Sequence, residues 1–162
     1  MPEAWDTTTA ARLRPDSPEL EYVTTRWQQG DPVAFTASTL NEVSYGLRKA
    51  ARPAADAQLA WLADQITAGL IDVLPFEHRA ADIAGALRLR IPTPPPATKR
   101  SKSRSKADNR VAWIMDLQVA ATVFVHGYDL LSVDAHHSLI ATELSALAPT
   151  APGLTIESPP QF

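Results

Sequence analysis

Apolar and polar positions along the chain switch between short compact runs and longer segments with helical spacing. The compact runs are bounded by Pro, Gly or Asp and predict buried strands at residues 33–36, 71–76 and 130–133. Elsewhere apolar residues recur three or four positions apart, which predicts helices that include residues 54–68, 77–89, 108–126 and 138–147. Strands that alternate with helices are typical of an α/β protein whose parallel sheet is covered on both faces.

Capping signals set the limits of several predicted helices. Ser17 followed by Pro18 predicts a helix start, because Ser is a good N-cap and Pro fits the first helical turn. Ser38 or Thr39 is expected to cap the helix that follows the strand at residues 33–36. Gly127 is the expected end of the long helix over residues 108–126.

The chain ends and one internal segment depart from this pattern. Residues 1–4 are poor strand material ahead of Asp6. Residues 92–107 are rich in Pro and basic residues, so we expect an exposed, mobile insertion within one domain over residues 1–150. Residues 154–156 predict an edge strand, within a C-terminal strand and tail over residues 151–162.

Composition narrows the class of protein. The 162 residues, 45% of them hydrophobic, are enough for one domain with a core. The absence of Cys excludes disulfides and thiolate metal sites. Neither a signal-peptide pattern nor an apolar run of about 18 residues is found, so we expect a cytoplasmic protein without a membrane span.

Charge is unevenly distributed along the chain. The formal net charge is −3, but five of the 15 Lys and Arg residues lie between positions 99 and 106. The remaining basic residues are outnumbered by 18 acidic ones. This basic run suits contacts with phosphates, and it suits a solvated linker equally well.

Four acidic residues stand at comparable places in the predicted fold. Asp6 follows the first strand, Asp134 follows the fourth, and Glu42 lies in the first turns of the helix after the second. Asp116 interrupts a helix that is apolar nearly all round, where an isolated carboxylate is costly. These places share one edge of a parallel sheet, so the carboxylates are expected to converge there. Mg²⁺ or Mn²⁺ would offset their repulsion and suit phosphodiester hydrolysis.

Each acid also has a purely structural interpretation. The segment from Thr39 to Glu42 fits a capping box, in which Glu42 would satisfy a backbone donor. Asp134 fits a helix N-cap or a turn, and Asp116 fits a buried pair with an arginine. Asp6 taken alone is weak evidence, so the hypothesis depends on the joint placement of all four.

Histidines and tryptophans add little to this hypothesis. The adjacent His136 and His137 suggest a metal pair, but neighbouring helical residues point in different directions, so surface placement is expected. Trp27, Trp61 and Trp113 have the spacing of core residues, which favours packing over base stacking. The sequence also lacks a Gly-rich phosphate loop, so nucleotide cofactor binding has no support.

Five successive segments resemble the motifs of PIN-domain ribonucleases, and most closely those of VapC-type bacterial toxins. They are residues 6–7, 36–46, 73–76, 116–122 and 131–134. The resemblance spans about residues 5–145 and implies a three-layer α/β/α sandwich with a central parallel sheet. It further implies RNA cleavage that depends on Mg²⁺ or Mn²⁺, a homodimer, and neutralisation by a cognate VapB-like antitoxin.

The same resemblance implies roles for individual residues. Asp6, Glu42, Asp116 and Asp134 would form the acidic site that holds the metal, with Ser132 as a nearby polar group. The family usually has an apolar first strand, which is nearly absent here. A rival interpretation is therefore a catalytically weak or inactive PIN-like module that binds RNA or a protein partner. A more distant rival is a doubly wound regulatory domain that binds no nucleic acid.

Overall fold

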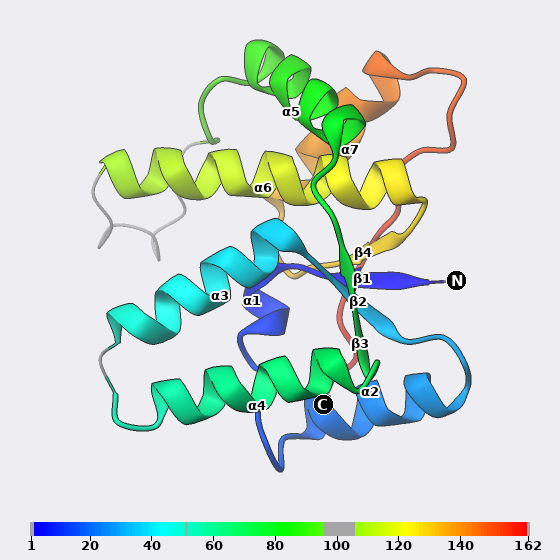
Figure 1. Cartoon of the computed structure of the whole chain (residues 1–162). Coiled ribbons are helices and arrows are strands. Elements are labelled where there is room, and N and C mark those ends of the chain that lie inside the picture. Colours follow the sequence, from blue (N-terminus) through cyan, green and yellow to red (C-terminus); the bar gives the residue numbers. More distant parts are fainter. Residues whose placement is uncertain (1, 51, 96–105, 162) are drawn as a thin grey trace.

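The computed structural model describes residues 2–50, 52–95 and 106–161 (Figure 1). Five parallel strands form one sheet in the order β3-β2-β1-β4-β5. In chain order the elements are β1 (Glu3–Trp5), α1 (Thr7–Ala10), α2 (Pro18–Gln28), β2 (Val33–Thr36), α3 (Ala37–Lys49), α4 (Ala55–Thr67), β3 (Ile71–Leu74), α5 (His78–Arg90), α6 (Lys106–His126), β4 (Asp129–Leu131), α7 (His136–Leu147) and β5 (Ile156–Glu157). The predicted α/β fold with a central parallel sheet is confirmed.

Helices cover both faces of the sheet, as the side-chain alternation along each strand requires. In Figure 1, α5, α6 and α7 lie on one side of the strands, and α2 and α4 lie on the other. The face toward α5, α6 and α7 buries Ala4, Ala34 and Leu130. The opposite face buries Trp5, Phe35 and Leu131 in a second core with α1 to α4. The three central strands therefore contribute to two cores, which makes three layers.

The first strand forms in spite of its weak sequence signal. Ala4 pairs with Ala34 on one side and with Leu130 on the other, so β1 lies at the centre of the sheet. Pairing along both edges and complete burial outweigh the low strand propensity of these residues. The short α1 helix that follows was not predicted.

Helix starts confirm one predicted cap and correct another. Ser17 Oγ accepts from Leu20 N at 3.3 Å, with Pro18 as the first residue of α2. The N-cap of α3 is Thr36, the last residue of β2, whose Oγ1 accepts from Thr39 N at 3.0 Å. A cap at Ser38 or Thr39 is therefore wrong, because the helix begins directly where the strand ends.

The remaining departures are small shifts of element boundaries. Helix α7 begins at His136, two residues before the predicted start, and β5 pairs in parallel with β4 at the edge of the sheet. Most of the insertion predicted at residues 92–107, namely residues 96–105, lies outside the described residues. None of the helices in the described ranges is both long enough and apolar enough to span a membrane.

Candidate metal centre

The carboxyl ends of β1 and β4 bring Asp6 and Ser132 together. Asp6 follows directly on β1, and its backbone N donates to Leu131 O at 3.1 Å, which continues the ladder between the strands. The Asp6 side chain is buried, with Oδ1 accepting from Thr9 N at 2.7 Å and Oδ2 from Ser132 Oγ at 2.5 Å. Asp6 is thus the N-cap of α1 and is fixed by the neighbouring strand end.

Ser132 is the centre of a buried hydrogen-bond network. Its Oγ accepts from Asp134 N at 3.0 Å and lies 2.8 Å from His137 Nδ1. An ionised Asp6 can only accept, so Ser132 gives Asp6 its single hydrogen and must accept from His137. His137 therefore carries its proton on Nδ1. One hydroxyl fixes the positions of both acids that follow strands.

The burial of His137 corrects the expectation that both histidines lie at the surface. His137 is 2% exposed, and its Nε2 has no hydrogen-bond partner among the described residues. Burial lowers the pKa of His137, against the opposing influence of the nearby Asp6 and Asp134 carboxylates. The side chain accordingly belongs to the interior of the site and supports Ser132 as an uncharged donor.

Helix α3 carries Glu42 to the same edge of the sheet. Thr39 Oγ1 donates to Trp5 O at 3.4 Å, which docks the first turn of α3 on the end of β1. Glu42 lies one turn further along, and its Oε2 accepts from Thr7 Oγ1 at 2.6 Å. The capping-box interpretation of Glu42 is wrong, because Thr36 is the cap and Glu42 is the sixth residue of the helix.

Helix α6 presents Asp116 from the other side of the site. The helix packs Trp113, Leu117 and Ala120 into the core, while Asp116 is partly exposed. Ser38 Oγ donates to Gln118 Oε1 at 3.0 Å, which ties α6 to the start of α3. Asp116 thus sits on a rigid helix that is anchored to the neighbouring strand–helix junction.

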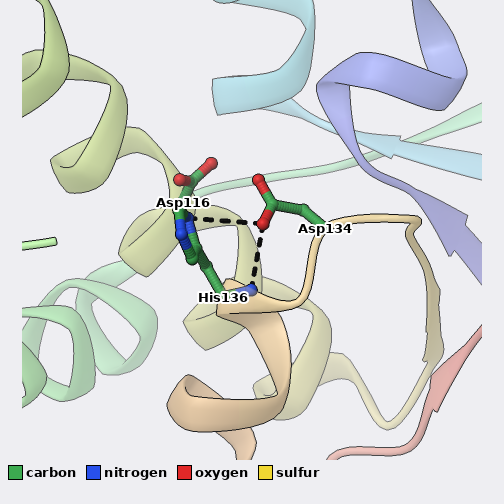
Figure 2. Close-up of side chains that lie close together, drawn as sticks. All are labelled: Asp116, Asp134 and His136. Carbon is green, nitrogen blue, oxygen red and sulfur yellow. Dashed lines mark hydrogen bonds and ion pairs between the residues drawn. The ribbon is translucent and has the colours of Figure 1, made fainter. Parts of the chain in front are cut away.

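Asp116, Asp134 and His136 meet in one group (Figure 2). Each offers one ligand atom, and these atoms all lie within 4.8 Å of one another. Asp134 Oδ1 accepts from His136 N at 2.9 Å, and His136 Nδ1 lies 3.3 Å from the same oxygen. Asp134 is thus a turn acceptor, as one structural interpretation held, and at the same time a member of a group able to hold a metal ion.

The four predicted acids are not all placed alike. Asp116 and Asp134 lie together directly, whereas Asp6 is linked to Asp134 through Ser132 and Glu42 accepts from Thr7, the residue after Asp6. Across residues 2–50, 52–95 and 106–161, the three-residue group that fits one ion contains neither Asp6 nor Glu42.

Sequence reasoning missed His136 as a member of this group. The available signal was the spacing of Asp134 and His136 across a strand-to-helix junction. There the helix start turns the histidine back toward the aspartate.

Solved structures with the same architecture are toxin–antitoxin proteins, although no family model and no curated protein matches this sequence. A chain of VapBC2 from Rickettsia felis, bound to a DNA fragment from the promoter, aligns with a TM-score of 0.59 and 14% identity over 99% of this chain and 100% of that one. DNA-bound VapBC from Salmonella typhimurium gives 0.59 and 18%, over 98% of both chains. VapBC-5 from Mycobacterium tuberculosis gives 0.52 and 21%, over 97% and 98%.

This chain has a PIN-like α/β fold. The alignments cover nearly all of both chains, so the similarity concerns the fold of the whole chain. The resemblance seen in the sequence and the similarity of the structures therefore point to the same fold, that of VapC toxins.

Proposed function

We propose that this protein is a metal-dependent endoribonuclease toxin of a VapBC-like toxin–antitoxin pair. The observation that carries the proposal is the group of Asp116, Asp134 and His136 at the carboxyl edge of a PIN-like sheet. Ligands in open parallel sheets bind at this edge, which supports a substrate-binding role for the group. The proposed substrate is the phosphodiester backbone of RNA, and the proposed compartment is the cytoplasm.

The donor set fits a divalent cation. Two carboxylates and an imidazole offer oxygen and nitrogen ligands, and within the described ranges no Lys or Arg forms an ion pair with Asp6 or Asp134. A bound Mg²⁺ or Mn²⁺ would offset negative charge at the phosphodiester and favour deprotonation of a water molecule. Asp116 and Asp134 would hold the ion directly. Asp6 and Glu42 would be the other two carboxylates of the four-carboxylate site, connected to it through Ser132 and Thr7.

The chain's own residues prepare this site before substrate arrives. Ser132 fixes Asp6 and Asp134 relative to each other, and His137 supports Ser132 without adding a positive charge. Thr7 orients Glu42 by donating to Oε2, which fixes this carboxylate at the edge of the sheet. Preorganised acceptors of this kind lose little freedom when the reacting groups bind.

The proposed partners follow from the structural neighbours. The neighbours are VapBC complexes, two of them bound to DNA, so a VapB-like antitoxin that neutralises this chain is the proposed protein partner. A homodimer is proposed from the resemblance of the sequence to VapC-type toxins. The rival interpretation as an inactive module depended on the weak first strand, and β1 forms at the centre of the sheet with Asp6 directly after it.

RNA cleavage with defined metals tests the proposal. Purified protein is incubated with total RNA in Mn²⁺ or Mg²⁺, with and without EDTA, and the new RNA ends are mapped. We expect cleavage at discrete internal positions that EDTA abolishes and added Mn²⁺ restores. Asp134→Asn, purified in parallel, controls for contaminating nucleases because it keeps the acceptor for His136 N and loses the charge. Equal cleavage by this variant, or none by the parent protein with either metal, would overturn the proposal.

A further inference from the structure

His136 is held beside the two aspartates by contacts with two residues, Asp134 and Trp113. Its backbone N donates to Asp134 Oδ1, and its Nδ1 lies 3.3 Å from that oxygen. Its ring makes an edge-to-face contact with Trp113, with ring centroids 6.1 Å apart and planes at 85°. Trp113 is itself fixed, since it is 1% exposed and its Nε1 donates to Ile91 O at 2.8 Å. The imidazole therefore has a defined position between α6 and Asp134.

The position of this ring is close to that of a metal ligand. Two ligands with bonds of about 2.1 Å to one ion lie up to about 4.2 Å apart when they are opposite each other. The ligand atoms of His136, Asp116 and Asp134 already lie within 4.8 Å of one another. A small closure of side chains would allow all three residues to hold one ion. His136 is partly exposed, with 29% of its side chain accessible, so an ion has access to the group.

We propose that His136 is the third protein ligand and makes this metal centre selective for Mn²⁺ over Mg²⁺. The inference rests on the metal site of the proposed function and names its preferred ion. Mg²⁺ prefers oxygen ligands and retains its waters, whereas imidazole nitrogen suits first-row transition metals. A site with two carboxylates and one imidazole thus favours the transition metal, while a site of carboxylates alone accepts either ion.

The competing role for His136 is that of an ion-pair partner for Asp134. In that role the imidazole stabilises the loop between β4 and α7 and moves aside when a cation binds. Removing it would then strengthen the binding of both cations or leave it unchanged, and the ratio of the two affinities would stay the same. The ratio is therefore the quantity that separates the two roles.

Direct metal binding provides the test, with three variants that differ only at the group. Dissociation constants for Mn²⁺ and Mg²⁺ are measured by calorimetry at one fixed pH on tag-free protein, for the parent, His136→Ala, His136→Asp and Asp116→Asn. We expect His136→Ala to weaken Mn²⁺ binding by about 10- to 100-fold, and to weaken Mg²⁺ binding much less. His136→Asp should tighten Mg²⁺ binding relative to Mn²⁺, because it converts the set to three carboxylates.

Pulsed EPR of the Mn²⁺-loaded protein gives a second readout that is independent of activity. The parent should show a hyperfine coupling to an imidazole ¹⁴N that disappears in His136→Ala. His136→Gln should lose the same coupling, and its longer polar side chain makes it the variant to use if His136→Ala folds poorly. Mn²⁺ bound without this coupling, with an unchanged Mn²⁺/Mg²⁺ ratio in the variants, would overturn the role of His136 alone. Failure of the folded parent to bind Mn²⁺ would overturn this inference together with the proposed metal-dependent function.

Discussion

The two ends of β1 each carry a buried acid, and the groups that contact the two carboxylates differ in charge. Glu3, at the amino end, is 6% exposed and accepts from Trp5 Nε1 at 3.2 Å and Tyr22 OH at 2.9 Å. The guanidinium of Arg26 lies 3.9 Å from its Oε2. Asp6, at the carboxyl end, is 3% exposed and is held by neutral donors, Thr9 N and Ser132 Oγ.

From this difference we expect Glu3 to support the fold and Asp6 to contribute to the candidate metal site. Near Glu3 the protein supplies a positive charge itself through Arg26, which Glu3 shares with Asp31. Around Asp6 and Asp134 the hydrogen-bond donors fix geometry, and no Lys or Arg in the described residues forms an ion pair with either acid. The basic side chains near Asp134 there are two histidines, His136 and His137. Two acids that neutral donors orient, without a Lys or Arg partner among the described residues, are suited to an external cation.

The largest expected effect is the loss of RNA cleavage in Asp116→Asn. The amide keeps the size of the side chain on a partly exposed helix position but supplies no charge to hold a cation. We expect activity to fall by about 100-fold or more, with the melting temperature nearly unchanged. Cleavage of RNA and thermal melting on the same preparation measure both. Cleavage at the parental rate would remove Asp116 from the site.

Glu3→Gln is the matched control at the opposite end of the strand. It also replaces a carboxylate by an amide, but it leaves Arg26 without its buried acidic neighbour, so the melting temperature should fall. RNA cleavage by the folded protein should be retained. Parallel losses of activity in both variants would break the distinction between the two ends.

The next largest effect is expected for Glu42→Gln. The amide oxygen can still accept from Thr7 Oγ1, so the contact between α1 and α3 is preserved while the charge is lost. We expect near-normal stability and a fall in RNA cleavage of about 10- to 100-fold. Thermal melting and cleavage on one sample measure it. Retained activity would place Glu42 with Glu3, among the acids that only support the fold.

The sequence predicted those parts of the protein whose signals are local. Period and length marked β2 and β3, and the Ser17–Pro18 pair marked the start of α2. The start of α3 was misplaced because Thr36 serves both as the last residue of β2 and as the helix cap. Local patterns contain no information about such a shared residue, since either element alone is consistent with the sequence.

The histidines show where sequence reasoning about the site reached its limit. Adjacent residues on a helix point in different directions, and this correct rule led to the prediction that both rings are at the surface. At the start of α7, His136 points toward Asp134 and His137 points toward Ser132. Both histidines are therefore part of the candidate site. Only the position of the preceding strand end decides this, and that position depends on the pairing of β4 with β1.

A smaller effect is expected from the five basic residues at positions 99, 100, 102, 104 and 106. Positions 99–104 lie outside the described residues, and this prediction rests on their charge. Replacing all five by Ser should weaken RNA binding, since the carboxyl edge of the sheet is acidic and phosphates need cations from elsewhere. The slope of log affinity against log salt should become shallower by about 0.7 for each phosphate of single-stranded RNA that is no longer neutralised.

Binding isotherms at several salt concentrations measure that slope, and thermal melting controls for stability. The melting temperature should stay almost unchanged, because the segment is predicted to lie outside the core. Unchanged affinity with an unchanged slope would make the segment a passive insertion, and the positive counterpart of the acidic edge would have to be sought elsewhere.

The smallest expected effect concerns Tyr22, and it tests how much the contacts of Glu3 at the amino end of β1 contribute to the stability of the fold. Burial raises the pKa of Tyr22 to about 12 from 10.0, and its hydrogen bond to Glu3 adds to the shift. A pKa that is higher in the folded state means that folding favours the protonated phenol. The resulting stability is fully present below pH 10 and is lost as the pH rises through 12.

Tyr22→Phe should therefore cost about 1 kcal/mol of unfolding free energy at about pH 8, the value of one hydrogen bond to Glu3. The difference between the two proteins should shrink as the pH rises above 10, because the parent alone loses the contribution of a buried phenol. Urea unfolding at about pH 8 and about pH 11 measures this difference, and Tyr45→Phe, at a residue 62% exposed, controls for the loss of one hydroxyl. A difference that is constant with pH would mean that the contact with Glu3 contributes packing alone. The amino end would then depend on Arg26 and Trp5 to hold its buried acid.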